Sequence, residues 1–378
     1  MKVVIVNCFD TYEDRVDILH SCFIKKDYDV TIIQSNFRHI KKTVREDEKQ
    51  GFVFVKSKPY FKNLSIARLL SHYNFAKDAF EIVNQIKPDL LYVLVPPNSL
   101  AKFSSVYKRR NKNVKLIFDL IDLWPETMPV GKIKRLPPFT FWKLMRDNNL
   151  NSADYIVTEC DLYKKKLVSV FKGLPTETIH LANKEIRVVT NEIDPKIYND
   201  EINLCYLGSI NNIIDIQKIK EIVKAINKIK PTTLHIIGDG ERKDLLIKEV
   251  ENAGARVEYH GKIYSAQQKQ NIFDKCHFGL NIMKDSVCVG LTMKSIDYFQ
   301  HGLPIINNIQ ADTTDIVDNH KIGINVTDNN MSSVADRIVN IDLEEYLEMK
   351  KNTYKVFNNY FSLDAFEEKI GTVLKNIL

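Results

Sequence analysis

The stretch TTLHIIGDGERKDLLIKEV, residues 232–250, contains a pattern that recurs through most of the chain. It begins with a short apolar run, turns at Gly238–Asp239–Gly240, and continues directly into a helix pattern. A strand whose apolar residues are continuous, rather than alternating with polar ones, is typical of a parallel sheet covered by helices on both faces. The stretch therefore predicts one strand–turn–helix unit of an α/β sheet.

The same alternation of strand and helix runs through most of the chain. In the first half, strands are expected at 2–7, 28–34, 51–57, 88–95, 114–120, 154–159 and 186–190, and a long helix at about 65–86. In the second half, strands are expected at 202–208, 232–238, 256–261, 278–283, 304–308 and 322–326. The polar stretch between the two series, 191–201, has no apolar period and predicts a linker.

Two doubly wound Rossmann-like domains facing across a cleft are the expected architecture, because 378 residues exceed what one core usually supports. We place the first domain at 1–190 and the second at 191–360, and expect the helix at 361–378 to pack back on the first. Six scattered cysteines without metal-like spacing indicate reduced thiols and a cytosolic protein. No apolar run approaches the roughly 18 residues that span a bilayer.

The net charge of +6 is unevenly distributed, with +11 in residues 1–190 and −5 in the remainder. A basic first half suggests an anionic partner such as phospholipid, a phosphorylated lipid or nucleic acid, although a solvated surface is equally compatible. In GKIKRLPPFTFWKLMR (131–146), basic residues are interleaved with aromatics such as Trp142, next to Lys143. This pattern favours an anionic membrane surface over nucleic acid; the alternative is a core-packing helix with a basic outer face.

The second half has three turns that suit a phosphate ligand. Gly208–Ser209 and Gly238–Asp239 each follow a strand and precede a helix, where glycine lets the backbone approach a ligand. Either could also be a plain turn. The third, GLTMKSIDYF (290–299), would place the amides of Gly290, Leu291, Thr292 and Met293 at a positive helix end.

Two charged residues follow that third turn. Lys294 and Asp297 lie three residues apart, so a helix places them on one face. The lysine with the amides suits a diphosphate, and the carboxylate suits ribose hydroxyls. The alternative is a surface Lys–Asp pair, which the apolar neighbours disfavour.

The first half offers three candidates. Arg15, at a helix start, is either an anion contact or a surface arginine. Asp122 follows a strand and either faces the cleft or caps a loop. His72, in the long helix, is either structural or a base or acceptor ligand, since Arg68 lies one turn before it.

The order LGSI, IIGDGERK, VEYHGKI and KSIDYFQHGLPII resembles the carboxyl-terminal half of family 4 glycosyltransferases. DLIDLWPET (119–127) resembles the DLWPE segment of bacterial members that build capsule, O-antigen or exopolysaccharide. The resemblance implies the GT-B fold and a glycosyltransferase that uses a nucleoside-diphosphate sugar. It also implies transfer with retention, in which the leaving diphosphate takes the acceptor proton, without a metal or other cofactor.

The resemblance also assigns residues. Lys294 stands at the family's diphosphate-binding lysine, and Asp297 replaces the ribose-binding glutamate. The backbone around Lys262 and Ile263 matches the family's nucleobase edge. Val289, eight residues before Asp297, stands where relatives place the first of the two glutamates, which helps to hold the donor sugar.

We therefore expect a cytoplasmic enzyme, peripheral at the inner membrane face, that moves a sugar, with UDP as the expected nucleotide, to a lipid-linked or growing glycan. A sugar-nucleotide epimerase of the same fold would need acid/base carboxylates on the donor, which the sequence does not supply. A non-catalytic partner subunit or acceptor-binding protein stays open, because the first glutamate is absent and the loop GSINNIID (208–215) lacks the family's Arg/Lys pair.

Overall fold

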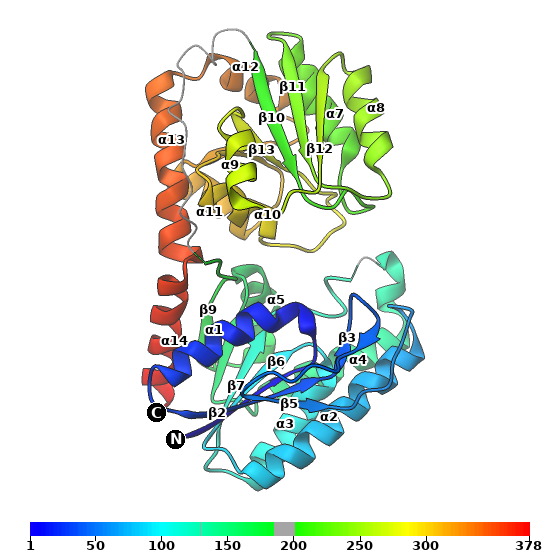
Figure 1. Cartoon of the computed structure of the whole chain (residues 1–378), viewed down its shortest axis with the longest axis vertical. Coiled ribbons are helices and arrows are strands. Elements are labelled where there is room, and N and C mark those ends of the chain that lie inside the picture. Colours follow the sequence, from blue (N-terminus) through cyan, green and yellow to red (C-terminus); the bar gives the residue numbers. More distant parts are fainter. Residues whose placement is uncertain (129, 185–200) are drawn as a thin grey trace. The chain divides into compact units, whose positions relative to one another are not determined.

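Two parallel sheets organise the part of the chain that the computed structural model describes, residues 1–128, 130–184 and 201–378. Unit 1 comprises Met1–Ala182 and Phe366–Leu378, and unit 2 comprises Asn183–Ala365 (Figure 1). The predicted α/β class with two Rossmann-like sheets is confirmed. The predicted boundary between residues 190 and 191 and the strand expected at 186–190 lie outside the described residues.

The sheet of unit 1 has seven parallel strands in the order β5-β2-β1-β6-β7-β8-β9. Their bounds are β1 Lys2–Asn7, β2 Asp29–Ser35, β5 Phe52–Val55, β6 Leu90–Val95, β7 Lys115–Leu120, β8 Tyr155–Thr158 and β9 Thr176–Thr178. A short hairpin, β3 Phe37–Arg38 and β4 Thr43–Val44, follows β2. The helices are α1 Glu13–Ile24, α2 Ile66–Ile86, α3 Asn98–Arg110, α4 Pro137–Leu150, α5 Asp161–Phe171 and α14 Leu363–Ile377, with short η1 Asp10–Tyr12 and η2 Gly131–Arg135.

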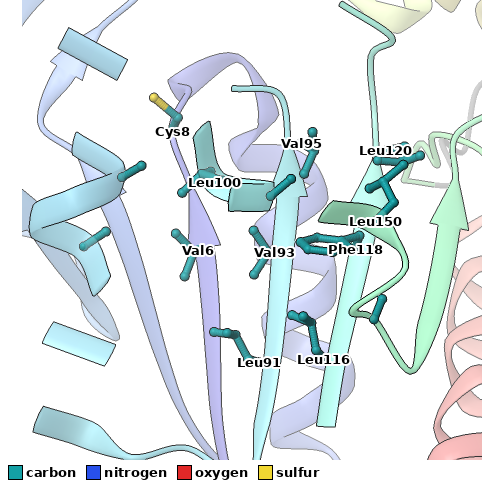
Figure 2. Packing of buried hydrophobic residues seen from close by; sticks show 14 of the residues in the cluster. Val6, Cys8, Leu91, Val93, Val95, Leu100, Leu116, Phe118, Leu120 and Leu150 are labelled. Atoms are coloured by element: carbon teal, nitrogen blue, oxygen red, sulfur yellow. The ribbon is translucent and has the colours of Figure 1, made fainter. Parts of the chain in front are cut away.

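Continuous apolar strands fill both faces of this sheet, as their sequence predicts. On one face, Val6, Val93 and Phe118 from neighbouring strands pack under Leu100 of α3 and Leu150 of α4 (Figure 2). The intervening residues of β1 face the opposite side, where α1 and α14 cover them. The last helix thus belongs to the core of unit 1, to which it contributes Phe366, Ile370, Val373, Leu374 and Ile377.

Unit 2 has six parallel strands in the order β12-β11-β10-β13-β14-β15. Their bounds are β10 Ile202–Leu207, β11 Thr232–Ile237, β12 Arg256–Gly261, β13 Phe278–Asn281, β14 Ile305–Asn307 and β15 Gly323–Asn325. The helices are α7 Ile216–Asn227, α8 Lys243–Asn252, α9 Ala266–Phe273, α10 Met293–Gln300, α11 Asp312–His320, α12 Met331–Asn340 and α13 Leu343–Val356, followed by a π-helical turn, η3 Phe357–Phe361. In each sheet the strands run parallel, so the carboxyl ends of its own strands lie at one edge of that sheet. Open α/β sheets bind ligands at this edge.

Candidate functional site

The two glycine loops of unit 2 lie in backbone contact at the carboxyl edge of the sheet. The amide of Gly208 donates to the carbonyl of Ile237 at 2.9 Å, and the amide of Gly238 donates to that of Gly261 at 2.7 Å. Gly238 has a φ of +143°, and a Cβ there would lie 2.0 Å from the carbonyl oxygen of Gly208. The close approach that glycine permits here is therefore one of backbone to backbone, between the two loops.

Replacing Gly238 by alanine is expected to lower the free energy of unfolding by about 2–4 kcal/mol, because the new methyl collides with backbone that cannot swing aside. Urea unfolding measures this loss. The control is Gly371→Ala in α14, where a Cβ meets nothing within 4 Å. If the two variants lose equal stability, the contact between the loops is not as tight as described.

Asp239 and Lys262 come together beside these loops. One carboxylate oxygen of Asp239 accepts from the amide of Gly240 at 2.8 Å, and the other lies 3.4 Å from the ammonium of Lys262. The Gly240 hydrogen bond lowers the pKa of Asp239. Ser209 is exposed and the neighbouring Ile263 is half-buried, so both lie within reach of solvent at this edge.

The start of α10 is fixed from outside the helix. Thr292 is its N-cap: its hydroxyl accepts from the amide of Ser295 and donates to the side chain of Asn281 at 2.8 Å. The carbonyl of Gly290 accepts from the amide and hydroxyl of Thr313. Leu291 is buried and Met293 is half exposed, so the segment is anchored on one side and open on the other.

A ladder of three asparagines, which the sequence pattern did not lead us to expect, supports that anchor. The side chain of Asn307 accepts from Asn281 at 2.9 Å and donates to Asn325 at 2.8 Å. Each asparagine ends a strand, so the ladder crosses β13, β14 and β15 at their carboxyl ends. An asparagine at the end of three successive apolar runs was the available signal.

Burial determines the electrostatics of Lys294. Its ammonium is buried without a hydrogen-bond partner and lies 4.8 Å from the centre of the Tyr206 ring. Burial lowers the pKa of Lys294 to about 7. An unpaired cation in the first turn of a helix that begins at the sheet's carboxyl edge is arranged to receive an anion.

Asp297 does not pair with Lys294. Its carboxylate accepts from Lys269 of α9 at 2.7 Å and lies 3.2 Å from Nδ1 of His301. Although burial raises the pKa of Asp297, the His301 hydrogen bond and the charge of Lys269 bring it below its usual value. The ribose contact predicted for Asp297 would have to share the carboxylate with these partners.

In unit 1, the structure places Asp122 and His72 near the carboxyl edge of the sheet in different environments. Asp122 caps its own loop, accepting from the amide of Leu123, the indole of Trp124 and the hydroxyl of Thr127. His72 is buried, with Nε2 3.2 Å from the Tyr60 hydroxyl and Nδ1 without a partner. Asp122 thus matches the capping alternative, while His72 keeps a free nitrogen.

Arg15 is not a surface residue, and the anion that it contacts is a carboxylate of the protein itself. Its guanidinium is buried and holds both carboxylate oxygens of Asp119, at 2.8 and 3.0 Å. It also donates to the carbonyls of Ile179 and His180. The prediction of a phosphate contact is therefore replaced by a core ion pair whose partner lies 104 residues away.

One group of possible metal ligands occurs among the described residues: His235, Glu258 and His260. Nδ1 of His235 lies 3.1 Å from Nε2 of His260, the ring planes differ by 3° and the ring centres lie 5.3 Å apart. These values place the rings nearly in one plane with the two nitrogens facing each other. This geometry suits a shared hydrogen bond better than ligands that converge on an ion.

Known proteins share the fold of the whole chain, and a family model matches most of unit 2. Residues 201–341 match the family model described as glycosyl transferases group 1. Among solved structures, sucrose-phosphate synthase from Thermosynechococcus elongatus is 13% identical, with a TM-score of 0.69 over 99% of this chain and 98% of that one. The lipopolysaccharide outer core galactosyltransferase WaaB is 13% identical, with a TM-score of 0.68 over 100% of both chains. Alr3699/HepE from Anabaena, in complex with UDP-glucose, is 11% identical, with a TM-score of 0.66 over 100% of both.

No curated protein sequence matches this chain. The predicted GT-B fold is confirmed, and residues 201–341 match the model of a group 1 glycosyltransferase domain. The predicted enzyme class, a glycosyltransferase, is confirmed.

Proposed function

We propose that this chain moves a glycosyl group from a UDP-sugar to a lipid-linked or growing polysaccharide acceptor in bacterial surface glycan synthesis. The observation that carries the proposal is the buried, unpartnered ammonium of Lys294 inside the group 1 glycosyltransferase domain. The UDP-glucose bound by Alr3699/HepE supports the nucleotide, and the lipopolysaccharide role of WaaB supports the acceptor class.

In the proposed reaction, Lys294 and the first amides of α10 hold the diphosphate as it leaves. Charge that develops on the departing phosphate is stabilised by donors fixed beforehand, and such stabilisation usually contributes more to the rate than any other single effect. The diphosphate itself takes the acceptor proton, so that retention needs no protein nucleophile. Holding the diphosphate in this way requires no metal.

A non-catalytic nucleotide-binding partner is the second candidate. Val289 stands where family members carry an acid for the donor sugar, and residues 208–215 contain no arginine or lysine. Such a protein would bind UDP without turning over any UDP-sugar. Binding and turnover measured on the same preparation separate the two candidates.

A thermal-shift series with UDP, GDP and their sugars tests the proposed function. A nucleotide present at 100 times its dissociation constant stabilises the folded state by about 2.7 kcal/mol, which raises the melting temperature measurably. We expect UDP to produce this shift and GDP to produce a smaller one. If no nucleotide changes the melting temperature, unit 2 does not bind the donor.

The structure changes which residues of the proposed membrane surface at 131–146 could contact lipid. No helix in the described ranges is both long and apolar enough to cross a bilayer. Trp142 is 9% exposed and packs on Trp124, whereas Phe141 is 67% and Leu144 46% exposed on the same helix, α4. Any lipid contact of α4 would therefore use Phe141 and Leu144, with Lys143 beside them.

Replacing Phe141 and Leu144 together by serine is expected to weaken partitioning onto anionic vesicles by about tenfold or more, since each apolar side chain contributes about 1.5–3 kcal/mol when buried. Co-sedimentation measures the partitioning. The control is Val168→Ser on α5, a side chain that is 69% exposed. If both variants and the unmodified protein partition equally, α4 does not contact the membrane.

A further inference from the structure

A buried arginine without an acidic partner lies at the carboxyl edge of the unit 1 sheet. Arg68, in the first turn of α2, is 4% exposed. Its guanidinium carbon lies 4.4 Å from the Trp124 ring centre, and 5.8 and 5.9 Å from those of Tyr60 and Phe9. It donates a hydrogen bond to the carbonyl of Asn63 at 2.7 Å and interacts with the Tyr60 side chain, while its Nε is buried with no partner.

Three further basic side chains gather around the same tyrosine. Nδ1 of His39 lies 2.7 Å and Nε2 of His72 lies 3.2 Å from the Tyr60 hydroxyl. The ammonium of Lys42 lies 4.8 Å from the centre of the Tyr60 ring. We call Arg68, His39, Lys42 and His72 the basic cluster.

The members of the basic cluster repel one another. Burial and then the charge of Arg68 lower the pKa of His39 to about 4, and the same two causes lower the pKa of Lys42 and of His72. Burial also lowers the pKa of Arg68 itself. Positive charge here is therefore unfavourable in the free protein, and a bound anion would relieve it.

Neither neighbouring acid neutralises the basic cluster. Asp10 accepts from the backbone amide of His39, and the oxygens of Asp122 are bonded within its own loop. Within the described residues, no carboxylate is ion-paired with any member of the cluster. The aromatic rings offset part of the cost of the Arg68 charge, about 0.5–2 kcal/mol each, but they offer no acceptor to its Nε.

The position of the basic cluster is one at which α/β sheets bind ligands. Phe9 follows the end of β1, Tyr60 follows β5 and Trp124 follows β7, so three strand ends supply the rings that hold Arg68. His39 and Lys42 are half-buried and can be reached from solvent, whereas Arg68 and His72 are buried. A planar guanidinium with free donors is the side chain best suited to phosphate or carboxylate.

We propose that the basic cluster binds a phosphate group of the acceptor. The proposal rests on the proposed function, because it names the acceptor of that transfer. The segment that carries Arg68 is also unusually apolar at its surface: Phe61 and Ile66 are each 76% exposed, Leu70 56% and Leu64 54%. A phosphate attached to an apolar chain would therefore contact both the charged and the apolar parts of this edge.

Calorimetric titration of the full chain with inorganic phosphate and with dodecyl phosphate, each in saturating UDP, tests the proposal. We expect both to bind. Arg68→Gln and Lys42→Gln should each weaken binding at least tenfold, while the affinity for UDP stays unchanged. Lys42 is half-buried, so Lys42→Gln should fold and can test the proposal if Arg68→Gln does not fold. The control is Lys77→Gln, which changes an exposed lysine of the same helix.

The outcomes separate the sources of the phosphate and the two proposals. Tighter binding of dodecyl phosphate than of inorganic phosphate indicates a lipid phosphate, and equal affinity indicates a polar phosphorylated acceptor. Unchanged phosphate affinity in both cluster variants overturns the proposal. Competition between phosphate and UDP for the basic cluster also overturns the proposal, because it would make the cluster part of the donor site. Failure of the unmodified chain to bind UDP contradicts the proposed function instead, while phosphate titration without UDP still tests the cluster.

Discussion

Replacing Lys294 by methionine is expected to lower glycosyl transfer and to stabilise the free protein at the same time. Loss of one fixed donor to a departing oxyanion typically removes about 2–4 kcal/mol of transition-state stabilisation. The opposite effect on folding follows from the environment of the ammonium, which is buried without a partner. A side chain that disfavours folding but favours turnover is what a preorganised anion site requires.

The effect of Lys294 on stability depends on pH in a defined direction. Burial lowers its pKa from 10.5 to about 7 in the folded protein. Between these values the unfolded chain binds more protons, so the contribution of Lys294 to the free energy of unfolding rises with pH from 7 to 10. Below pH 7 both states are charged and the folded state bears the full cost. Lys294→Met should therefore be more stable than the unmodified protein at pH 6 by about 1–3 kcal/mol. Above pH 7 the free energy of unfolding of the variant should rise less with pH than that of the unmodified protein.

Lys350 provides a matched control for this prediction. It is half-buried in α13 of the same unit, its ammonium lies 5.9 Å from the Tyr346 ring centre, and burial lowers its pKa as well. Lys350→Met should change stability in the same direction and leave UDP affinity unaltered. Urea unfolding at pH 6 and pH 9, with UDP titrations of both variants, makes the comparison. If Lys294→Met and Lys350→Met bind UDP equally well, Lys294 is not a diphosphate ligand.

Replacing Arg15 by methionine is expected to lower the free energy of unfolding by about 3–5 kcal/mol, because it leaves a buried carboxylate without its cation. Asp119 is fully buried, and its remaining side-chain partner is the hydroxyl of Tyr92 at 2.8 Å. Urea unfolding at pH 7 measures the loss. UDP affinity, normalised to folded protein, should not change.

A second variant separates the ion pair from the packing of the arginine. In Arg15→Met/Asp119→Leu both charges are absent, so much of the lost stability should return. If the double variant is as unstable as Arg15→Met alone, the loss comes from packing against Phe366, whose ring centre lies 5.0 Å from the guanidinium. A loss below about 1 kcal/mol for Arg15→Met would contradict a buried ion pair.

Sequence pattern predicted the features that depend on neighbouring residues. The apolar run of β1, the Gly238 turn and the helix that follows residues 290–292 were all predicted from local composition, and the structure has each of them. The three-residue strand β9 went unrecognised, because Thr176–Thr178 contains no apolar run. Local pattern was therefore sufficient for most of the elements within each sheet.

Side-chain partners distant in the sequence could not be predicted in this way. Arg15 and Asp119 are 104 residues apart, and Lys269 reaches Asp297 from another helix. Only the folded sheet brings such groups within hydrogen-bond distance. For the same reason, the sequence could identify Lys294 as a candidate but could not show that its ammonium is buried and unpaired.

The decisive test of the proposed glycosyl transfer is UDP release from UDP-sugars by the purified full-length chain, with and without a lipid extract as the acceptor source. We predict that at least one UDP-sugar is consumed, that the extract increases the rate, and that Lys294→Met abolishes most of the release while Lys350→Met does not. UDP binding without release from any UDP-sugar would indicate the non-catalytic partner. Release that is unaffected by Lys294→Met would contradict the role of this lysine in holding the departing diphosphate.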